Sequence, residues 1–320
     1  MPTRLSFTAL ILGLSIAALV TGCGNDDDAK APKPRGFALS FAAVADGKHI
    51  GCEDTVEGLG PDGNDSIGLS DLRFYVSNLE LWDAAGSEVA FTLDENDFQY
   101  DSEAGQVSLI DLTSNTKGSC AGNAIAFAEG TKRTNDSVTG TTVVENVKSV
   151  SFDLGVPQAV MKDVIAEHTP EGAPSPLAEM QWTWATGYRH FVMNFAVTDA
   201  DGKTGDGYVH IGSRDCGPAD GLALKDRERC DFVNTPRVSL AAFDLDKNVV
   251  TLDVPAALAG LDFVSPVYDL TTFEVIGEGP GVECHSSPDQ PDCPTLFDHF
   301  GLDIDSGKAK ASRNVVFGVE

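Results

Sequence analysis

Residues 71–81 read Asp-Leu-Arg-Phe-Tyr-Val-Ser-Asn-Leu-Glu-Leu, and their side chains alternate in character along the segment. Leu72, Phe74 and Val76 recur at every second position, which is the period of a strand that buries one of its faces. Three other segments alternate in the same way, at 37–43, 150–154 and 191–195, and 238–240, 249–252 and 315–317 are further strand candidates. Many short strands of this kind predict an all-β chain, either an antiparallel β-sandwich or a barrel-like sandwich.

Turn and helix signals are fewer and fit between these strands. Asp201-Gly202, between Val197 and Tyr208, is typical of a hairpin turn, and Ala85-Gly86 is a similar signal. Two short helices are expected, one over 157–168 and one over 255–261, because each begins near a proline. No internal repeat and no linker is visible after Arg35, so we expect a single β domain over residues 37–320.

The N-terminus resembles an export signal rather than part of the fold. Arg4 supplies a positive charge, residues 5–20 are apolar, and Val20-Thr21-Gly22-Cys23 has the small residues of a lipobox. We therefore expect a lipoprotein signal peptide over 1–22, lipidation of Cys23, and a flexible tether over 23–36. Gly24 suits sorting to the outer membrane, so a periplasmic, lipid-anchored protein of a Gram-negative bacterium is predicted. A plain secretory signal cleaved elsewhere is the alternative.

The remaining cysteines indicate disulfide bonds. Seven cysteines are present, and the lipidated Cys23 accounts for the odd one. An even number of cysteines in an exported protein favours disulfides. No C-x-x-C pair occurs in the sequence, so a cysteine metal site or a redox site has no support. Closeness in sequence suggests the pairs Cys216–Cys230 and Cys284–Cys293, which leaves Cys52–Cys120 as the third.

The charge of the chain excludes some partners. Asp and Glu outnumber Lys and Arg by 49 to 22, giving a formal net charge of -27, which repels nucleic acid. No G-x-S-x-G, Walker or H-E-x-x-H motif occurs, so no enzyme activity is expected. The acidic stretches 62–65 and 94–97 leave an irregular calcium site open, but no EF-hand fits, because His210 stands at the twelfth position of the loop that begins at Asp199. A cleft with paired carboxylates is a weaker alternative, since no spacing singles out such a pair.

The segment 176–191 concentrates unusual residues. Trp182 and Trp184 are two positions apart, so in a strand both indole rings project from the same face. An aromatic core patch is the simpler interpretation of this pair. Histidine is the commonest metal ligand, and the chain has six: His49, His168, His190, His210, His285 and His299.

The motifs of the chain resemble, in order, those of the MbnP-like family, also called W-x-W-domain or metallo-mystery pair four-Cys-motif proteins. Residues 71–81 resemble the family's D-x-R-F-Y-V-S strand, and residues 107–111 resemble its L-L-D segment. The other similar stretches are Leu154-Gly155-Val156-Pro157, the W-x-W…G-Y stretch 182–188, His210-Ile211-Gly212-Ser213 with Cys216, and the C-terminal Cys284 and Cys293 with Phe297, Gly301 and Leu302. This resemblance extends from about Phe37 to the end of the chain.

The resemblance implies a periplasmic copper-binding protein that is not an enzyme. It implies copper(I) held by histidines beside a tryptophan that a di-haem, MauG-like partner oxidises to kynurenine. His168 and His210 lie at family motif positions and are the predicted ligands, although Glu167 replaces the usual Asn before His168. Either Trp182 or Trp184 is the candidate for modification. His190 stands where relatives carry Lys, and the resemblance gives no role to His49, His285 or His299. The alternative is a structural lipoprotein, or one that binds calcium or another ligand, without a redox-modified site.

Overall fold

The computed structural model describes residues 33–113, 120, 134–143, 146–168, 172–183, 187–216, 230–269, 271–272, 274–310 and 314–320. The predicted signal peptide, Cys23 and Trp184 lie outside the described residues. Residues 33–320 form one compact unit. Its first strand begins at Arg35, inside the segment expected to be tether. No helix in the described part of the chain is long and apolar enough to cross a membrane.

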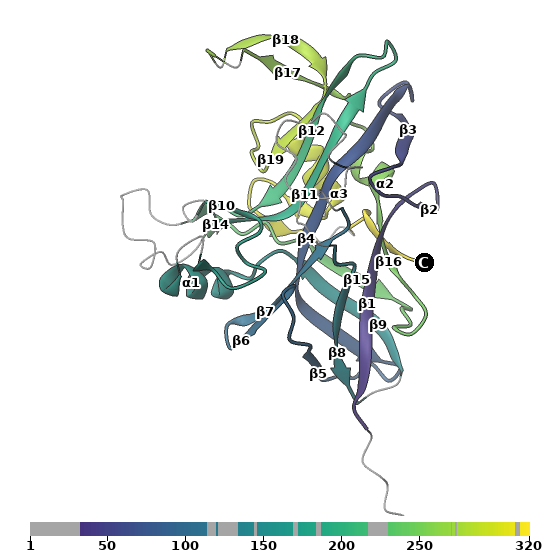
Figure 1. Ribbon diagram of the computed structural model, residues 1–320, viewed down its shortest axis with the longest axis vertical. Coiled ribbons are helices and arrows are strands. Elements are labelled where there is room, and N and C mark those ends of the chain that lie inside the picture. Colours follow the sequence, from purple (N-terminus) through teal and green to yellow (C-terminus); the bar gives the residue numbers. More distant parts are fainter. Residues whose placement is uncertain are drawn as a thin grey trace, which may run out of the picture. The chain divides into compact units, whose positions relative to one another are not determined.

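Two sheets make up most of this unit, as the alternation predicts (Figure 1). The six-stranded sheet consists of β1 (Arg35–Ala45), β2 (Lys48–His49), β5 (Phe91–Leu93), β8 (Ser137–Thr142), β16 (Val250–Asp253) and β22 (Phe317–Val319). The ten-stranded sheet consists of β3 (Thr55–Leu59), β4 (Asp65–Asp83), β6 (Gln99–Ser102), β7 (Gly105–Asp111), β9 (Val147–Leu154), β10 (Gln181–Thr183), β11 (Gly187–Thr198), β12 (Thr204–Gly212), β15 (Arg237–Ala241) and β19 (Val282–His285). The prediction of an all-β sandwich is thereby confirmed.

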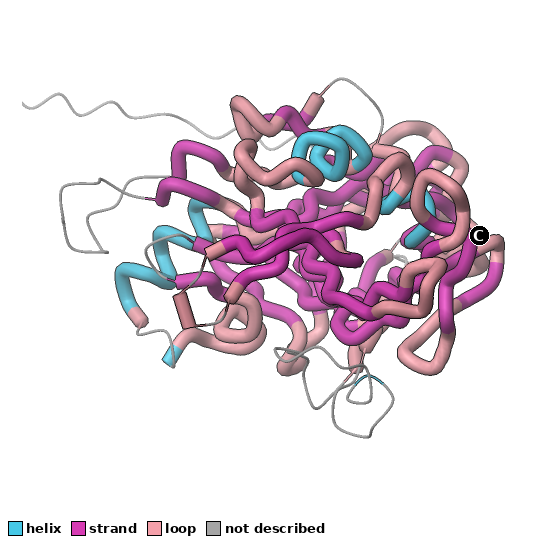
Figure 2. The backbone as a smooth tube through the Cα atoms, turned by 90° about the horizontal axis from the view of Figure 1, so that it is seen from above, coloured by secondary structure: helices cyan, strands magenta, loops and turns pink. Residues whose placement is uncertain are grey.

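Three strand pairs and three short helices complete the described structure. The strand pairs are β13 (Arg214–Cys216) with β14 (Cys230–Phe232), β17 (Val264–Tyr268) with β18 (Val275–Pro280), and β20 (Leu302–Asp303) with β21 (Lys308–Ala309). The helices are α1 (Gln158–Glu167), α2 (Val254–Leu258) and α3 (Cys293–His299). Figure 2 shows the helices around a body of strands. The helices predicted near Pro157 and Pro255 are present, whereas α3 was not predicted.

The main core lies between the two sheets. Phe41 of β1 packs edge-on against Phe74 of β4 and Phe152 of β9, with ring centroids 5.5 and 5.6 Å apart. Phe317 of β22 packs against Phe74 at 5.6 Å. These phenylalanines lie on the alternating apolar positions of their strands, so the period-two pattern gives the inner face of each sheet directly.

The ten-stranded sheet also has a covered outer face. Tyr75 of β4, Val192 of β11, and Val160 and Val164 of α1 belong to a second buried apolar cluster there. Helix α1 contributes its apolar positions to this cluster, which fits the single hydrophobic face expected over 157–168. Strand β4 is therefore buried on both faces, one against each cluster.

Two strand pairings of the described residues are parallel, whereas the sequence favoured an antiparallel sandwich. β1 pairs in parallel with β16, and β12 pairs in parallel with β19. Parallel neighbours require a long connection that returns the chain to the same end of the sheet. The segment between Gly212 and Val282 is long enough for this, but its course is not encoded in local periodicity.

All three predicted disulfides are present, joining Cys52 to Cys120, Cys216 to Cys230, and Cys284 to Cys293. Closeness in sequence predicted two of these pairs, and the third followed by elimination, because its cysteines are 68 positions apart. In the chain-entropy model, closing a loop like that between Cys216 and Cys230 stabilises the fold by roughly 3 kcal/mol.

Candidate metal centre

Polar side chains gather on the outer face of the ten-stranded sheet, where β4, β11, β12 and β19 lie next to one another. Strand register places Asn194 between Asp71 on one side and Tyr208 on the other. One row further along, His210 lies between Val192 and His285. The inner faces of the same strands carry the phenylalanines and aliphatic residues of the main core.

His210 and His285 form a pair at the centre of this face. Their Nδ1 atoms are 2.9 Å apart and their ring centroids are 4.7 Å apart. His210 is buried, with 7% of its surface exposed, and His285 is partly exposed. The parallel register between β12 and β19 brings the two rings together, because it aligns His210 with His285 directly.

Asn194 binds the other nitrogen of His210. The Oδ1 atom of Asn194 lies 2.7 Å from His210 Nε2, and both side chains are buried. An amide oxygen can accept a hydrogen bond but cannot donate one. His210 Nε2–H is therefore the donor, and Nδ1 carries the lone pair that faces His285.

The surroundings keep both imidazoles neutral. Burial, followed by His285, Arg189 and Arg73, holds the pKa of His210 well below its ordinary value. Burial also lowers the pKa of His285; Arg189 adds to that effect and Glu283 opposes it. Neutral imidazole is the form that binds metal ions.

Strand β4 carries a buried ion pair beside the two histidines. The Arg73 guanidinium donates two hydrogen bonds to the Asp71 carboxylate, through Nε and Nη2, each 2.7 Å long. Asp71 has no exposed surface and Arg73 only 2%. A bidentate pair of this kind fixes the position of both groups. The arginine charge therefore stays close to His210 and disfavours protonation of its ring.

Trp182 is the aromatic neighbour of the pair. Its ring is 6.5 Å from that of His210, at an interplanar angle of 66°. Strand β10 pairs with the start of β11, where Gln181 is opposite Tyr188, and this pairing holds the tryptophan there. A Cβ at Gly212 would lie 3.0 Å from the Trp182 ring and overlap the Tyr188 carbonyl oxygen, so the strand needs glycine at this position. The position of Trp184 is outside the described residues.

The two sequence motifs around Trp182 and His210 pack against each other. Ser213 Oγ accepts a hydrogen bond from the Tyr188 N–H at 2.9 Å. Gly187 has φ +90, and a side chain there would overlap Ser213 Oγ and crowd Cys216 Sγ. The glycine, serine and cysteine spacings of both motifs thus serve one junction, which places Trp182 beside His210.

Tyr208 completes the lining of the pair. Its ring centroid is 6.0 Å from that of His210 and 5.8 Å from that of His285. Burial, followed by Asp206, raises the pKa of the Tyr208 hydroxyl to about 12, so the ring is uncharged at neutral pH. Tyr208 therefore adds an apolar wall beside two neutral imidazoles.

Two of the other four histidines, His168 and His190, lie in different settings. His168 is exposed at the end of α1, where its backbone N–H donates to the Val164 carbonyl at 2.9 Å. Among the contacts of the described residues, none joins His168 to His210. His190 is fully buried; its Nδ1 accepts from the Val156 N–H at 3.2 Å and its Nε2 binds the Val233 carbonyl at 2.8 Å. Both nitrogens of His190 are thus used by the backbone.

Within the described residues, the acidic turns do not form a complete set of ligands for a cation. No group of three or more His, Cys, Asp or Glu side chains is arranged there to hold a metal ion. Asp65 does lie near Asp199 and Asp62, and burial together with these two carboxylates raises its pKa. The calcium alternative therefore has an acidic cluster behind it but no set of ligands.

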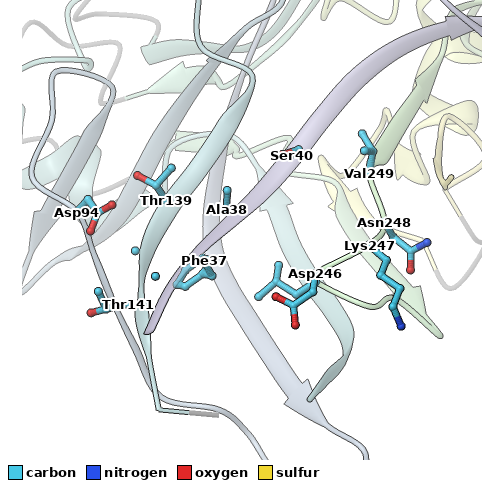
Figure 3. Close-up of a pocket in the computed structure, with 13 residues that line it drawn as sticks. Phe37, Ala38, Ser40, Asp94, Thr139, Thr141, Asp246, Lys247, Asn248 and Val249 are labelled. Atoms are coloured by element: carbon cyan, nitrogen blue, oxygen red, sulfur yellow. The ribbon is translucent and has the colours of Figure 1, made fainter. Parts of the chain in front are cut away.

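A pocket of about 560 Å³ lies on a different part of the molecule. Figure 3 shows Phe37 and Ala38 of β1 on one side of it and Asp246 to Val249 on the other. Its described lining includes no histidine and no tryptophan. The pocket is therefore separate from the histidine pair and shares none of its chemistry.

Sequence reasoning missed His285 and Asn194. His285 has no local signal, because its role depends on a parallel pairing with a strand some 70 residues earlier. Asn194 had a usable signal: it interrupts the apolar run 191–197 on the face opposite Met193 and Phe195. A buried polar residue in such a strand requires a hydrogen-bond partner.

Comparison with known proteins gives a consistent picture. The MbnP family model matches residues 34–272. Among solved structures, the chain is similar to MbnP from Methylosinus trichosporium, with 27% identity and a TM-score of 0.66. That match covers 90% of this chain and 98% of the other. No curated protein matches the chain.

Proposed function

Because the chain belongs to the MbnP family, we propose that it is a copper-binding protein whose metal site is the pair His210 and His285, beside Trp182. The observation that carries this proposal is the approach of two neutral Nδ1 atoms to 2.9 Å on a buried face. Imidazole suits copper, whereas calcium prefers oxygen ligands. The donor set therefore fits copper better than the calcium alternative.

Each neighbour has a defined part in this proposal. His210 and His285 would hold the ion, and burial keeps both rings neutral and ready to bind. Copper(I) is the expected oxidation state by family resemblance. His168 was predicted as a ligand from its motif position, and it stays a prediction that a variant can test. No catalytic residue is proposed, because the role is binding.

Trp182 is our choice for the modified residue, since among the described residues it is the tryptophan whose ring lies beside His210. The poor ligand indole would become kynurenine, which exposes an aniline nitrogen and a carbonyl oxygen. In this change one ring carbon leaves as formic acid, three water molecules supply the new ketone oxygen and both oxygens of the formic acid, and four electrons and four protons are released. A di-haem, MauG-like partner takes up the electrons. We further propose that the chain is exported, lipidated at Cys23 and anchored in the periplasm, most simply to the outer membrane.

Copper(I) titration of three variants tests the site. Replacing His210 or His285 with Ala should abolish tight binding, because each removes one of the two proposed nitrogen ligands. The His168→Ala variant decides whether the exposed histidine also contributes. His49→Ala is the matched control, because His49 is an exposed histidine that contacts Glu320. Retention of full affinity in both His210→Ala and His285→Ala would contradict the proposed site.

The mass of the peptide that contains Trp182 and Trp184, isolated from the native host, tests the modification. Kynurenine differs from tryptophan by the loss of one carbon and the gain of one oxygen. Fragmentation assigns the change to one of the two rings, and we expect Trp182. Unmodified tryptophan in copper-loaded protein would exclude kynurenine without excluding copper binding.

A further inference from the structure

We propose that Asn194 is a positioning residue that fixes the tautomer of His210, so that Nδ1 is the nitrogen offered at the histidine pair. The hydrogen bond on which this rests joins Asn194 Oδ1 and His210 Nε2 at 2.7 Å. Its relevance to copper rests on the proposed function, whereas the tautomer itself is a property of the metal-free chain.

The burial of both groups makes this hydrogen bond decisive. Asn194 is 2% exposed and His210 is 7% exposed, so water does not replace the amide oxygen readily. With the proton on Nε2, a neutral His210 ring has its lone pair on Nδ1. With the amide oriented as it is in the structure, the opposite tautomer would set the Nε2 lone pair against the Asn194 oxygen, an arrangement that costs the desolvation of two buried acceptors.

The position of Asn194 is itself set by the sheet. β11 lies between β4 and β12, and register places Asn194 between Asp71 and Tyr208. Its neighbours Met193 and Phe195 are fully buried on the opposite face, in the main core. The asparagine backbone therefore cannot shift without disturbing that core, and its amide meets His210 at a fixed place.

This arrangement makes the two histidines unequal. Because His210 Nδ1 is an acceptor, the proton in the 2.9 Å contact belongs to His285 Nδ1. For His285 to present a second lone pair at Nδ1, that proton has to move to its own Nε2 or leave. His285 is partly exposed, which lets water assist the exchange. His210 is then the metal ligand with a fixed tautomer, and His285 is the ligand that changes tautomer. Hydrogen bonds to the far nitrogen of a ligating histidine orient and tune it in just this way.

Nitrogen NMR of the imidazole rings in the metal-free protein tests the tautomer directly. We expect wild-type His210 to be protonated at Nε2. Asn194→Leu should remove this preference and give a mixture of tautomers. Asn194→Asp should restore Nε2–H, because a carboxylate accepts the same hydrogen bond. Asn314→Ala is the control, since Asn314 is also buried but bonds the backbone of Phe300 and Val316.

Copper(I) affinity provides the second measurement. Asn194→Leu should weaken binding by roughly 10–100-fold, the usual cost of removing such a supporting group, and Asn194→Asp should recover most of it. Asn314→Ala should leave both the tautomer and the affinity unchanged, even if the fold is less stable.

The outcomes separate this inference from the proposed function. A wild-type His210 protonated at Nδ1, or an unchanged tautomer in Asn194→Leu, overturns the role of Asn194. If the tautomer behaves as expected and the wild-type protein binds no copper, the role of Asn194 stands and the proposed function fails.

Discussion

At the residue scale, chemistry in this protein depends on which nitrogen of each histidine the fold leaves available. His190 uses both ring nitrogens on backbone groups, His210 uses one on Asn194, and His285 lies against His210. A histidine therefore stabilises the backbone in one strand and is a candidate metal ligand in the next. Hydrogen-bond partners decide between these roles, not the residue type.

The lowered pKa of His190 predicts how the stability of the fold changes with pH. Burial lowers its pKa to about 4, so it is neutral in the folded chain, whereas an unfolded histidine has a pKa of about 6.5. Its contribution is fully present above the unfolded value and is lost as pH falls from about 6.5 toward 4. By linkage, this loss amounts to about 2 kcal/mol at pH 5.

Urea unfolding of wild type and His190→Gln at neutral and mildly acidic pH measures this effect. Glutamine offers an oxygen to the Val156 N–H and an amide N–H to the Val233 carbonyl, but it does not titrate. The wild type should lose more stability on acidification than the variant. The other histidines titrate in both proteins and cancel in the difference. Parallel pH profiles would show that His190 does not supply the effect.

At the scale of elements, the site depends on the docking of β19 onto β12. The Cys284–Cys293 disulfide joins β19 to the start of α3, and His285 follows Cys284 directly. Ser286 then fixes the end of the strand: its Oγ donates to the His210 carbonyl at 2.9 Å and accepts from the Gly212 N–H at 2.8 Å. A covalent link and two hydrogen bonds thus hold the histidine pair in register.

Removal of single disulfides should separate stability from binding. Ala replacement of Cys284 and Cys293 removes the crosslink that closes a span of 9 residues, which should lower the stability of the fold by about 2.5 kcal/mol. It should also weaken copper(I) binding, because β19 loosens. Ala replacement of Cys52 and Cys120 opens a span of 68 residues, a cost of about 4 kcal/mol, yet should leave copper affinity unchanged. Urea unfolding and copper titration measure the two effects. The reverse order of copper affinities would contradict the assigned role of β19.

At the scale of the whole molecule, the ten-stranded sheet separates two tasks. Its inner face closes the main core against the six-stranded sheet, and its outer face carries the polar row and the histidine pair. Around this body, the chain has a formal net charge of -27. Such a charge attracts cations and basic protein surfaces over long distances at low salt.

The charge predicts a salt-dependent encounter with the proposed di-haem partner, provided that its docking surface is basic. The association rate should fall steeply as salt rises, because the Debye length shrinks from about 30 Å at 0.01 M to about 8 Å at 0.15 M. Copper affinity at the buried pair should change far less. Stopped-flow mixing at several salt concentrations measures the first quantity and copper titration the second. An association rate independent of salt would exclude electrostatic steering.

Local patterns in the sequence predicted the main strands, the disulfides and part of the proposed site. Leu72, Phe74 and Val76 revealed β4 because alternation is local, and the cysteine pairs followed from closeness along the chain. Motif order pointed to the family, and it singled out His168 and His210 together with Trp182 and Trp184, without choosing between the two tryptophans. The tertiary structure alone decided that His285 and Asn194 meet His210. Parallel pairing of β12 with β19 joins residues 75 positions apart, and no local period encodes that register.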